Sequence, residues 1–569
     1  MKDIEIRILK REKNRNTHSS DGKVPLSQAL IRAPFGTRAD SLVGHFNVPE
    51  QEIAAVKINN EILPLGARIE INAAIEPVLL EDPEGTMIYR RSLAFLLAVA
   101  SRRIFPEKNL YVGHSLGHGY YYTFAEGQKP AVEEIESLKN EMLALVREDL
   151  PISFGCMAYG EALELFEKSR QTDTALLLEE RSESRVLVNE CKGFVDLYIE
   201  PLVNRTGLLS YFDLIAYQDG LLLRFPGIGR GHTLDPFEDS PGIFSVYDEY
   251  KKWGRIVGVH AVGHLNRLVA NRSIRDYIRI AEAFQAKKMS EIADRIYAKK
   301  ETVKAVLIAG PSSSGKTTTA KRLSIDLKVM GIEPIAISLD DYYVGTDRTP
   351  LDENGKPDFE CLEALDIPYL NEQLLALFAG EEVTLPVFDF KSGRRRETGG
   401  RKIRMERRTM LVIEGIHGLN DALTPQIAGE LKFKLYVSAL TQLNLDDHNR
   451  IPTSDNRLLR RMVRDYQFRG AGAERTFQMW PSVQKGERKH IFPYQNSADA
   501  AFNSALDYEL AVLKFYADPL LRSVKPNMTE YAEAVRLLSF LGNFAPIPPQ
   551  YVPTQSILRE FIGESEFKY

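Results

Sequence analysis

Residues Gly310 to Thr317 have the types and spacing of a loop that binds phosphate groups, because they fit the pattern G-x-x-x-x-G-K-[ST] without deviation. The apolar run Ala305 to Ile308 precedes this loop, and apolar residues at helical spacing follow it as far as Met330. A helix that begins at such a loop presents unpaired amides and a partial positive charge, while glycine lets the backbone approach phosphate oxygens closely. The pattern predicts a strand, a phosphate-binding loop and a helix, in the order that phosphoryl transfer requires.

Individual roles follow from the side chains of this loop. Lys316 supplies a positive charge at the β and γ phosphates and is a predicted catalytic residue, and the Thr317 hydroxyl is a predicted ligand of Mg²⁺. The predicted cofactors are therefore ATP and Mg²⁺. The residues predicted to contact the ATP phosphates are Gly310, Ser313, Ser314, Gly315, Lys316, Thr317 and Thr318.

Acidic residues follow two further apolar runs. Pro334 to Leu339 is followed by Asp340 and Asp341, and Thr409 to Ile413 is followed by Glu414. Parallel strands direct their carboxyl ends to one edge of the sheet, so these carboxylates are expected to face the same crevice as the loop. One carboxylate there can orient and deprotonate an acceptor hydroxyl while another holds the magnesium ion. The alternative is that they cap the following helices, an alternative that is strongest for Asp341.

Arginines are concentrated in one segment that also has apolar residues at helical spacing. Guanidinium groups can grip phosphates with two hydrogen bonds and close over a site as a lid. A solvated basic helix face is the alternative interpretation of the same pattern. The arginines are Arg450, Arg457, Arg460, Arg461, Arg464, Arg469 and Arg475.

Two pairs of histidines have H-x-x-x-H spacing, His114 with His118 and His260 with His264. This spacing can place two imidazoles on one face of a helix. Neither pair has the internal glutamate of a zincin, and the first pair lies in a glycine-rich segment that disfavours a helix. We therefore predict that neither pair holds a metal ion, although the first could line a cleft for a small ligand.

The 569 residues are too many for a single core, and the pattern of elements predicts a multidomain protein. Its fold class is an N-terminal β-rich domain and an α+β domain, followed by an α/β domain with a parallel sheet. A segment dense in Gly and Pro separates the two halves, and its glycines Gly227, Gly229 and Gly231 do not match a nucleotide fingerprint. The predicted divisions are residues 1–85, 86–225, 226–300 (a linker and helical segment), 301–525 and 526–569 (a helical tail).

The composition is that of an ordinary globular protein, with 44% hydrophobic and 27% charged residues. A net charge of −5 gives no support to wrapping of nucleic acid by the whole chain. The three cysteines, Cys156, Cys191 and Cys361, form no C-x-x-C pair and fit a reducing compartment. No signal peptide and no membrane-spanning run is predicted, so we expect a cytoplasmic location without a membrane partner.

Between about residues 300 and 520 the chain resembles the uridine kinase branch of the uridine kinase and phosphoribulokinase superfamily. Six motifs in order are much more specific than the loop alone. They are GPSSSGKTT, ISLDDYY, PDFECLEALD, LPVFDFKSGRR, LVIEGIHGLN and DNRLLRRMVRD.

The resemblance implies that Asp340 is the catalytic carboxylate and that Glu414 helps to hold Mg²⁺. It also implies nucleoside contacts from Tyr343, Phe359, Glu360 and Phe388. Arg457, Arg460 and Arg461 correspond to a lid with phosphate contacts.

The sequence departs from that family at two positions. Glu360 stands where the family often has an aspartate for the ribose hydroxyls, and Gly393 stands where uridine and cytidine kinases typically have a histidine that reads the base. The EGIHG stretch with His417 is also similar to phosphoribulokinases. A sugar or sugar phosphate is therefore the alternative acceptor.

The first half is similar to the TGS β-grasp domain and the following domain of threonyl-tRNA synthetases. The segments VKINNEILPLGARIE, LEDPEGTMIYRRSLAFLLAVASRRIFP, GYYYTF and FVDLYIEPL follow that pattern over roughly residues 50–205. The synthetases carry a histidine and cysteine constellation in this second domain. The corresponding positions here are Arg91, Phe95, Tyr198 and Leu202, so we expect this metal and editing chemistry to be lost.

Together these features predict a nucleoside kinase that transfers phosphate from ATP to the 5′-hydroxyl of a ribonucleoside, with uridine or cytidine as the expected acceptor. A regulator that senses nucleotides or binds RNA through its N-terminal half is the alternative of a different class, and the net charge does not support it. The sequence does not predict the oligomeric state.

Overall fold

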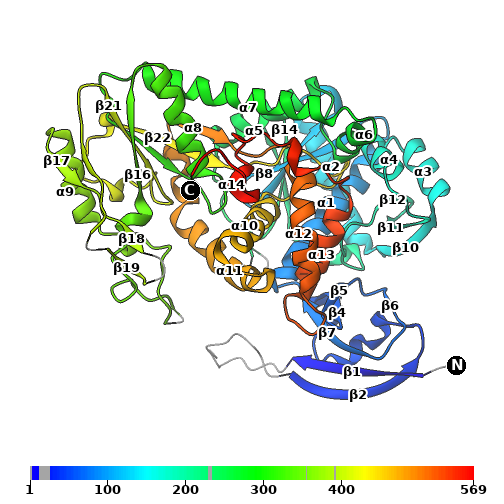
Figure 1. Cartoon of the computed structure of the whole chain (residues 1–569). Coiled ribbons are helices and arrows are strands. Elements are labelled where there is room, and N and C mark those ends of the chain that lie inside the picture. Colours follow the sequence, from blue (N-terminus) through cyan, green and yellow to red (C-terminus); the bar gives the residue numbers. More distant parts are fainter. Residues whose placement is uncertain are drawn as a thin grey trace.

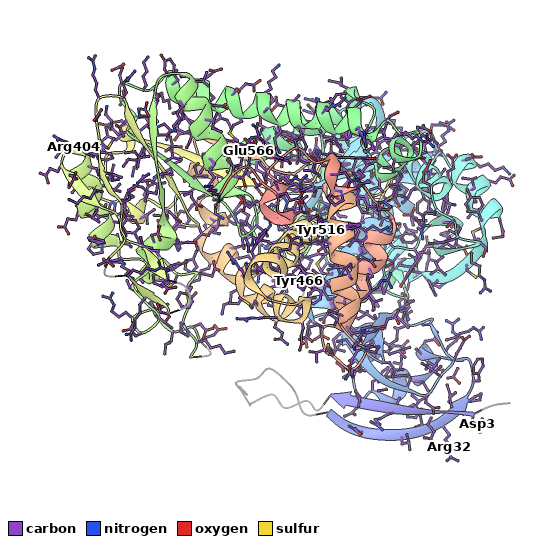
Figure 2. The ribbon with its side chains drawn as sticks, in the orientation of Figure 1. Asp3, Arg32, Arg404, Tyr466, Tyr516 and Glu566 are labelled. Atoms are coloured by element: carbon purple, nitrogen blue, oxygen red, sulfur yellow. The ribbon has the colours of Figure 1, made fainter. Side chains whose placement is uncertain are left out.

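The computed structural model describes residues 3–11, 26–228, 233–353, 355–389, 392–396 and 398–568. Gly229 and Gly231 of the segment between the halves lie outside the described residues. Figure 1 shows the N-terminal β-rich unit as a separate lobe below the rest of the molecule. Figure 2 places Arg32 of that lobe and Arg404 of the C-terminal half at opposite ends of the molecule.

The N-terminal lobe is built on a mixed five-stranded sheet in the order β2-β1-β7-β4-β5. Strand β1 pairs antiparallel with β2 and parallel with β7. Alternation of Ile4, Ile6 and Ile8 places these three side chains in a buried core, as a half-buried strand requires. The strands are β1 (Asp3–Arg11), β2 (Leu26–Pro34), β4 (Ile53–Ile58), β5 (Glu61–Leu63) and β7 (Ala73–Leu79), with the short pair β3 (Thr37–Arg38) and β6 (Arg68–Ile69) beside them.

The next part of the chain is an α+β unit with two antiparallel sheets, in the orders β13-β14-β9-β8 and β10-β11-β12. The long helix α1 (Pro83–Ile104) buries one apolar face against the first sheet and against α2. The other elements are β8 (Leu110–Ser115), β9 (Gly119–Phe124), α2 (Val132–Glu148), β10 (Ser153–Ala158), α3 (Tyr159–Lys168), α4 (Thr172–Glu179), β11 (Arg185–Cys191), β12 (Phe194–Leu197), β13 (Asp213–Tyr217) and β14 (Gly220–Arg224).

The C-terminal half is built on a five-stranded sheet in the order β16-β21-β15-β22-β23, in which every pairing is parallel. Strand β15 is buried along its whole length, as expected for the centre of a sheet covered on both faces. The strands are β15 (Ala305–Ala309), β16 (Glu333–Ser338), β21 (Thr409–Glu414), β22 (Lys432–Ser438) and β23 (Ala500–Asn503). The predicted fold class, mixed N-terminal sheets followed by an α/β domain with a parallel sheet, is confirmed.

Helices and two short antiparallel strand pairs, β17 with β20 and β18 with β19, accompany the parallel sheet. Figure 1 shows β18 and β19 below β16. The elements are α8 (Lys316–Val329), α9 (Ile367–Phe378), β17 (Glu382–Thr384), β18 (Phe388–Asp389), β19 (Arg394–Arg395), β20 (Lys402–Arg404), α10 (Thr453–Arg469), α11 (Ala473–His490), α12 (Glu509–Ser523), α13 (Tyr531–Gly542) and α14 (Arg559–Ile562).

The helical part of the segment 226–300 does not behave as a linker. Helices α5 (Pro241–Ile256), α6 (Val262–Ala270) and α7 (Ile274–Tyr297) follow each other, and α7 packs against α8. A single apolar core includes Leu177 of α4, Ile278 of α7 and Val306 of β15. The synthetase-like unit and the parallel-sheet unit are therefore joined by shared packing rather than by a loose connection.

The chain beyond residue 525 is likewise packed rather than a free tail. Leu537, Ile557 and Phe561 are buried in the same core as the parallel sheet. Figure 1 shows α14 beside α10, and the two helices are in contact. This packing brings the end of the chain to the phosphate-binding loop.

Within the described residues, no helix is both long enough and apolar enough to cross a membrane.

Candidate active site

The phosphate-binding loop joins β15 to α8, as the sequence predicts. Ser313 and Gly315 have positive φ values of 59° and 82°, so the backbone turns sharply and directs successive amides inward. A Cβ at Gly310 would lie 1.9 Å from the carbonyl oxygen of Val437, which explains why only glycine fits there. The Lys316 ammonium donates to the carbonyls of Gly310 at 3.0 Å and Pro311 at 3.1 Å, so it lies over the loop.

The side chains of the loop fit a group with many acceptor oxygens. The hydroxyls of Ser313, Ser314 and Thr319 are buried and have no hydrogen-bond partner among the described residues. Buried hydroxyls are normally paired, so three together at a helix N-terminus indicate a ligand that accepts hydrogen bonds. The triphosphate of ATP has this chemistry.

The predicted magnesium residues lie together. The Thr317 hydroxyl is 3.4 Å from Oε1 of Glu414, and the Ser338 hydroxyl is 3.3 Å from the same oxygen. Burial and the nearby charge of Asp340 together raise the pKa of Glu414 to about 7, against the lowering effect of Lys316. This set of hydroxyl and carboxylate oxygens fits Mg²⁺.

The two aspartates after β16 differ in their contacts. Asp341 accepts a hydrogen bond from the backbone N–H of Phe388 at 3.1 Å, whereas Asp340 forms no hydrogen bond or ion pair with any described residue. Loss of water around Asp340 raises the pKa of its carboxyl, an effect that Lys316 opposes and Asp341 reinforces. Asp340 is therefore the carboxylate available to an acceptor, and Asp341 positions the β18 strand.

The aromatic residues predicted to contact a nucleoside form one cluster. The ring of Tyr343 lies 5.8 Å from that of Phe359, perpendicular to it, and 5.6 Å from that of Phe388. The Tyr343 hydroxyl donates to the Phe359 carbonyl at 3.2 Å, which fixes its ring. Phe359 remains 37% exposed, so the cluster has an open face for a flat ring.

Glu360 is held behind this cluster by α11. A Cβ at Gly486 would lie 2.6 Å from the Cβ of Glu360, so the glycine allows the close approach. Burial and the charge of Glu487 raise the pKa of Glu360 to about 7, against the lowering effect of Arg461 and Lys316.

The position where uridine kinases typically have a histidine is a tight turn. Gly393 has φ +67°, and a Cβ there would lie 2.3 Å from the Thr346 hydroxyl. A histidine at this position would need a different local backbone. His417 is buried beside His490 of α11, with ring centroids 5.8 Å apart, and lies against the backbone of Glu360 and Cys361.

The predicted lid arginines require a correction. Arg460 is completely buried, paired with Glu509, and donates to the Ser313 carbonyl at 3.3 Å. Arg457 is paired with Glu487 and donates to the Ser312 carbonyl at 3.0 Å.

Both guanidiniums thus support the loop from beneath, and a fully paired buried arginine cannot swing over a substrate. Arg461 reaches the Ser312 hydroxyl at 2.8 Å. The charges that face Asp340 from α10 are those of Arg464 and Arg469.

Two further carboxylates contact the loop and have no signal in the sequence. Glu487 accepts from the Ser312 N–H at 2.9 Å, and Glu560 accepts from the Thr318 N–H at 3.1 Å and from the Thr318 hydroxyl. They lie 175 and 242 positions from their partners in the chain. Such long separations follow only from the packing of α11 and α14.

The positions aligned with the synthetase metal ligands lie together but are filled by packing. Arg91 forms an ion pair with Glu200 and donates to the Pro201 carbonyl at 3.3 Å. Phe95 packs against Phe194 with ring centroids 5.6 Å apart, Tyr198 packs against Phe154 at 4.7 Å, and Leu202 is buried.

Comparison with known proteins finds different similarities in the two parts of the chain. Residues 305–511 match the model of the Phosphoribulokinase / Uridine kinase family. A segment of 167 residues is 33% identical to the threonine–tRNA ligase of Desulforamulus reducens, and one of 170 residues is 33% identical to that of Thermotoga petrophila. Each match covers 29% of this chain and 26% of the ligase, so the chain spans about a quarter of these relatives.

Solved structures similar to the C-terminal half include two kinases. A possible uridine kinase from Bacillus stearothermophilus is 21% identical, with 38% of this chain and 98% of that chain covered and a TM-score of 0.27. The D-glycerate 3-kinase from Cryptococcus neoformans is 14% identical, with 45% and 87% covered and a TM-score of 0.21. The family model that residues 305–511 match is one of kinases.

Proposed function

We propose that the chain, whose residues 305–511 match the phosphoribulokinase and uridine kinase family, transfers the γ-phosphate of ATP to the 5′-hydroxyl of a ribonucleoside. The observation that carries this proposal is the aromatic cluster of Tyr343, Phe359 and Phe388 beside Asp340. An open aromatic face suits a nucleobase, and a sugar phosphate offers no comparable flat surface.

Each residue of the site has a defined task in this reaction. The loop amides and Lys316 bind the phosphates, and Asp340 orients the acceptor hydroxyl and accepts its proton. Thr317 and Glu414 would hold a magnesium ion, which would neutralise charge on the transferred group. Arg457 and Arg460 keep the loop in the conformation that directs its amides inward.

Substrate choice follows from Gly393 and Glu360. Glycine provides no side-chain donor for the edge of a base, so stacking and backbone groups must discriminate between bases, and these tolerate several of them. The Glu360 carboxyl can accept hydrogen bonds from both ribose hydroxyls. We therefore expect a looser base preference than that of a typical uridine kinase and a clear preference for ribose over 2′-deoxyribose.

The test is ADP release with the full chain, ATP and Mg²⁺ against uridine, cytidine, inosine, adenosine, their deoxy forms, sugars and sugar phosphates. Turnover with several ribonucleosides and weak turnover with deoxy forms is the expected result. Activity only with a sugar phosphate would replace the nucleoside proposal with a phosphoribulokinase-like one. Absence of turnover together with salt-dependent binding of tRNA would favour a regulator.

A further inference from the structure

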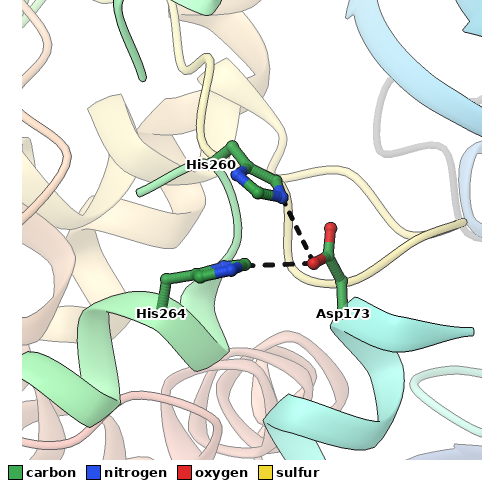
Figure 3. Close-up of side chains that lie close together, drawn as sticks. All are labelled: Asp173, His260 and His264. Carbon is green, nitrogen blue, oxygen red and sulfur yellow. Dashed lines mark ion pairs between the residues drawn. The ribbon is translucent and has the colours of Figure 1, made fainter. Parts of the chain in front are cut away.

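Three potential metal ligands come together far from the kinase site. The Nε2 of His260 lies 3.3 Å from Oδ1 of Asp173, and the Nδ1 of His264 lies 3.9 Å from the same oxygen. One potential ligand atom from each residue lies within 4.8 Å of the other two. Figure 3 shows the three side chains directed toward one another, with Asp173 on α4, His264 on α6 and His260 just before α6.

The spacing of the histidines alone did not indicate this group. His260 precedes the helix, so the pair is not held on one helical face, yet its ring centroids are only 4.2 Å apart. The third member, Asp173, lies 87 positions before His260 in the chain and is brought there by the packing of α4 against α6. A sequence motif cannot predict such a ligand.

The carboxylate of Asp173 lacks the partners that its burial requires. The residue is 3% exposed, and its Oδ2 has no hydrogen-bond partner among the described residues. The Nδ1 of His264, the atom that faces Asp173, is also buried without a hydrogen-bond partner there. Buried polar atoms are paired in the great majority of cases, so this concentration of unpaired nitrogen and oxygen atoms points to a bound group.

The three side chains indicate which kind of ion could bind between them. Two imidazoles with one carboxylate form a set that zinc accepts, with a fourth position left for water. Metal–ligand distances of about 2.0–2.2 Å place neighbouring ligands of a tetrahedral ion roughly 3.3–3.6 Å apart. The 3.3 Å separation of His260 from Asp173 matches this spacing, and the 3.9 Å separation of His264 would shorten on binding. The side chains of His260 and His264 are 38% and 24% exposed, so the group is open to solvent on one side.

The backbone around these ligands is fixed by a loop of the kinase half. Asp447 accepts from the Thr174 N–H at 2.8 Å and from the Thr174 hydroxyl at 3.0 Å. The Asn444 N–H donates to the His260 carbonyl at 3.0 Å, and the Val262 N–H donates to the Asn444 carbonyl at 2.9 Å. This loop therefore holds the backbone at His260 itself, at Thr174 next to Asp173, and at Val262 two residues before His264.

The sequence predicted no metal ion at His260 and His264, but with Asp173 beside them we propose that these three residues bind one divalent transition-metal ion of the zinc class, with water in the fourth position. The ion ties the synthetase-like half to the α5–α6 connection. Because the loop at residues 444–447 leads to α10, which supports the phosphate-binding loop, the ion also stabilises the junction between the two halves. The site is separate from the positions aligned with the synthetase ligands, where Arg91 and Phe95 now stand.

The test uses the full chain freed of metal with a chelator and titrated with Co²⁺ and then Zn²⁺. The variants are His260→Gln, whose side chain is partly exposed and least needed for folding, and Asp173→Asn. His45→Ala, at an exposed histidine, is the matched control. A change in metal binding in Glu414→Gln would show that the ion is bound at the kinase site instead.

We expect one ion per chain, visible absorption typical of tetrahedral Co²⁺, and displacement by Zn²⁺. His260→Gln and Asp173→Asn should weaken binding at least about tenfold, within the roughly 10–100-fold range for perturbing even the outer shell of a metal site. The His45→Ala variant should bind as the wild type does. A wild-type protein without such absorption, equal affinity in all variants, or loss only in Glu414→Gln would overturn the proposal, and thermal unfolding of each variant verifies that it is folded.

Discussion

The kinase site and the synthetase-like half differ at the positions that correspond to functional residues of the similar families. In the kinase site, Lys316, Asp340 and Glu414 keep their charges close together although loss of water raises the pKa of both carboxyls. In the synthetase-like half, the aligned ligand positions also lie together, but Phe95 is buried and Arg91 is paired with Glu200. Ionisable side chains that stay buried and close together at an energetic cost indicate a site of chemical reaction. Side chains that are well packed or fully paired indicate a structural role instead.

The largest expected effect comes from Lys316→Ala. The loss of this charge should lower turnover by at least about 10³-fold, at the upper end of the range for removal of a single electrostatic contact to the reacting group. The fold should remain intact, because among the described residues the ammonium donates its hydrogen bonds to carbonyls of its own loop. ADP release and thermal unfolding are the measurements, and turnover within about tenfold of wild type would remove Lys316 from the mechanism.

Asp340→Asn should lower turnover by roughly 10²–10⁴-fold while ATP binding is retained, because the amide cannot accept the acceptor proton. Asp341→Asn is the matched neighbour, since Asp341 is engaged by the Phe388 N–H. Single-turnover kinetics and ATP titration separate the two steps. A larger loss of turnover in Asp341→Asn than in Asp340→Asn would mean that Asp341, not Asp340, is the catalytic carboxylate.

Glu560→Gln tests the contact of the C-terminal segment with the loop. The carboxylate accepts from the Thr318 N–H at 3.1 Å, and this is an amide that the sequence assigns to a phosphate. Removal of its negative charge should lower the KM for ATP by about threefold to tenfold, the effect of a 0.6–1.4 kcal/mol change, with little change in kcat. Glu566→Gln, on the same segment, is the control, and a raised KM would show that Glu560 assists nucleotide binding instead.

The pH dependence of stability tests the charge retained at Glu414. Its pKa in the folded state is about 7, above the ordinary value of 4.5, so the folded protein binds a proton more tightly than the unfolded chain does. Stability from this group is present below pH 4.5 and is lost as the pH rises through about 7.

Thermal unfolding of the metal-free protein between pH 5 and 8 should therefore show wild type losing stability relative to Glu414→Gln, on the order of 1 kcal/mol. Mg²⁺ with ATP should remove the difference. A parallel pH dependence in the two proteins would contradict the raised pKa.

The sequence predicted the parts of this molecule that depend on local order. A strand, a loop and a helix at residues 305–329 follow from periodicity and the glycine pattern, and Asp340 and Glu414 follow from their places after apolar strands. The roles of Arg457 and Arg460 were predicted wrongly as a lid, because their buried partners Glu487 and Glu509 come from later helices.

Contacts between distant segments carry no local pattern. The reach of Glu560 to Thr318 and the meeting of Asp173 with His260 depend on how helices from different parts of the chain pack. The segment 226–300 could not be predicted for the same reason. Its apolar helical faces are visible in the sequence, but not the fact that they pack into one core with the two halves of the chain.

The smallest effect on activity is expected from Arg91→Ala, which tests whether the synthetase-like positions act only as scaffold. Arg91 and Glu200 have side chains 23% and 15% exposed, so their pairing should contribute more than a surface ion pair. Loss of the guanidinium should destabilise the protein by about 1–3 kcal/mol, since it leaves the Glu200 carboxylate and the Pro201 carbonyl with one partner fewer.

Arg32→Ala is the matched control, because the pair of Arg32 with Glu5 is 77% and 50% exposed and should contribute less than about 1 kcal/mol. Figure 2 places Arg32 at the outer edge of the N-terminal lobe. Denaturant unfolding measures stability, and ADP release measures turnover under conditions where both variants are folded. Turnover should stay within about twofold of wild type in Arg91→Ala, because Arg91 contacts Glu200 and Pro201 rather than any residue of the phosphate loop. A much larger loss of turnover in a folded Arg91→Ala protein would mean that this region still communicates with the kinase site, and the contrast between a chemical half and a scaffolding half would then fail.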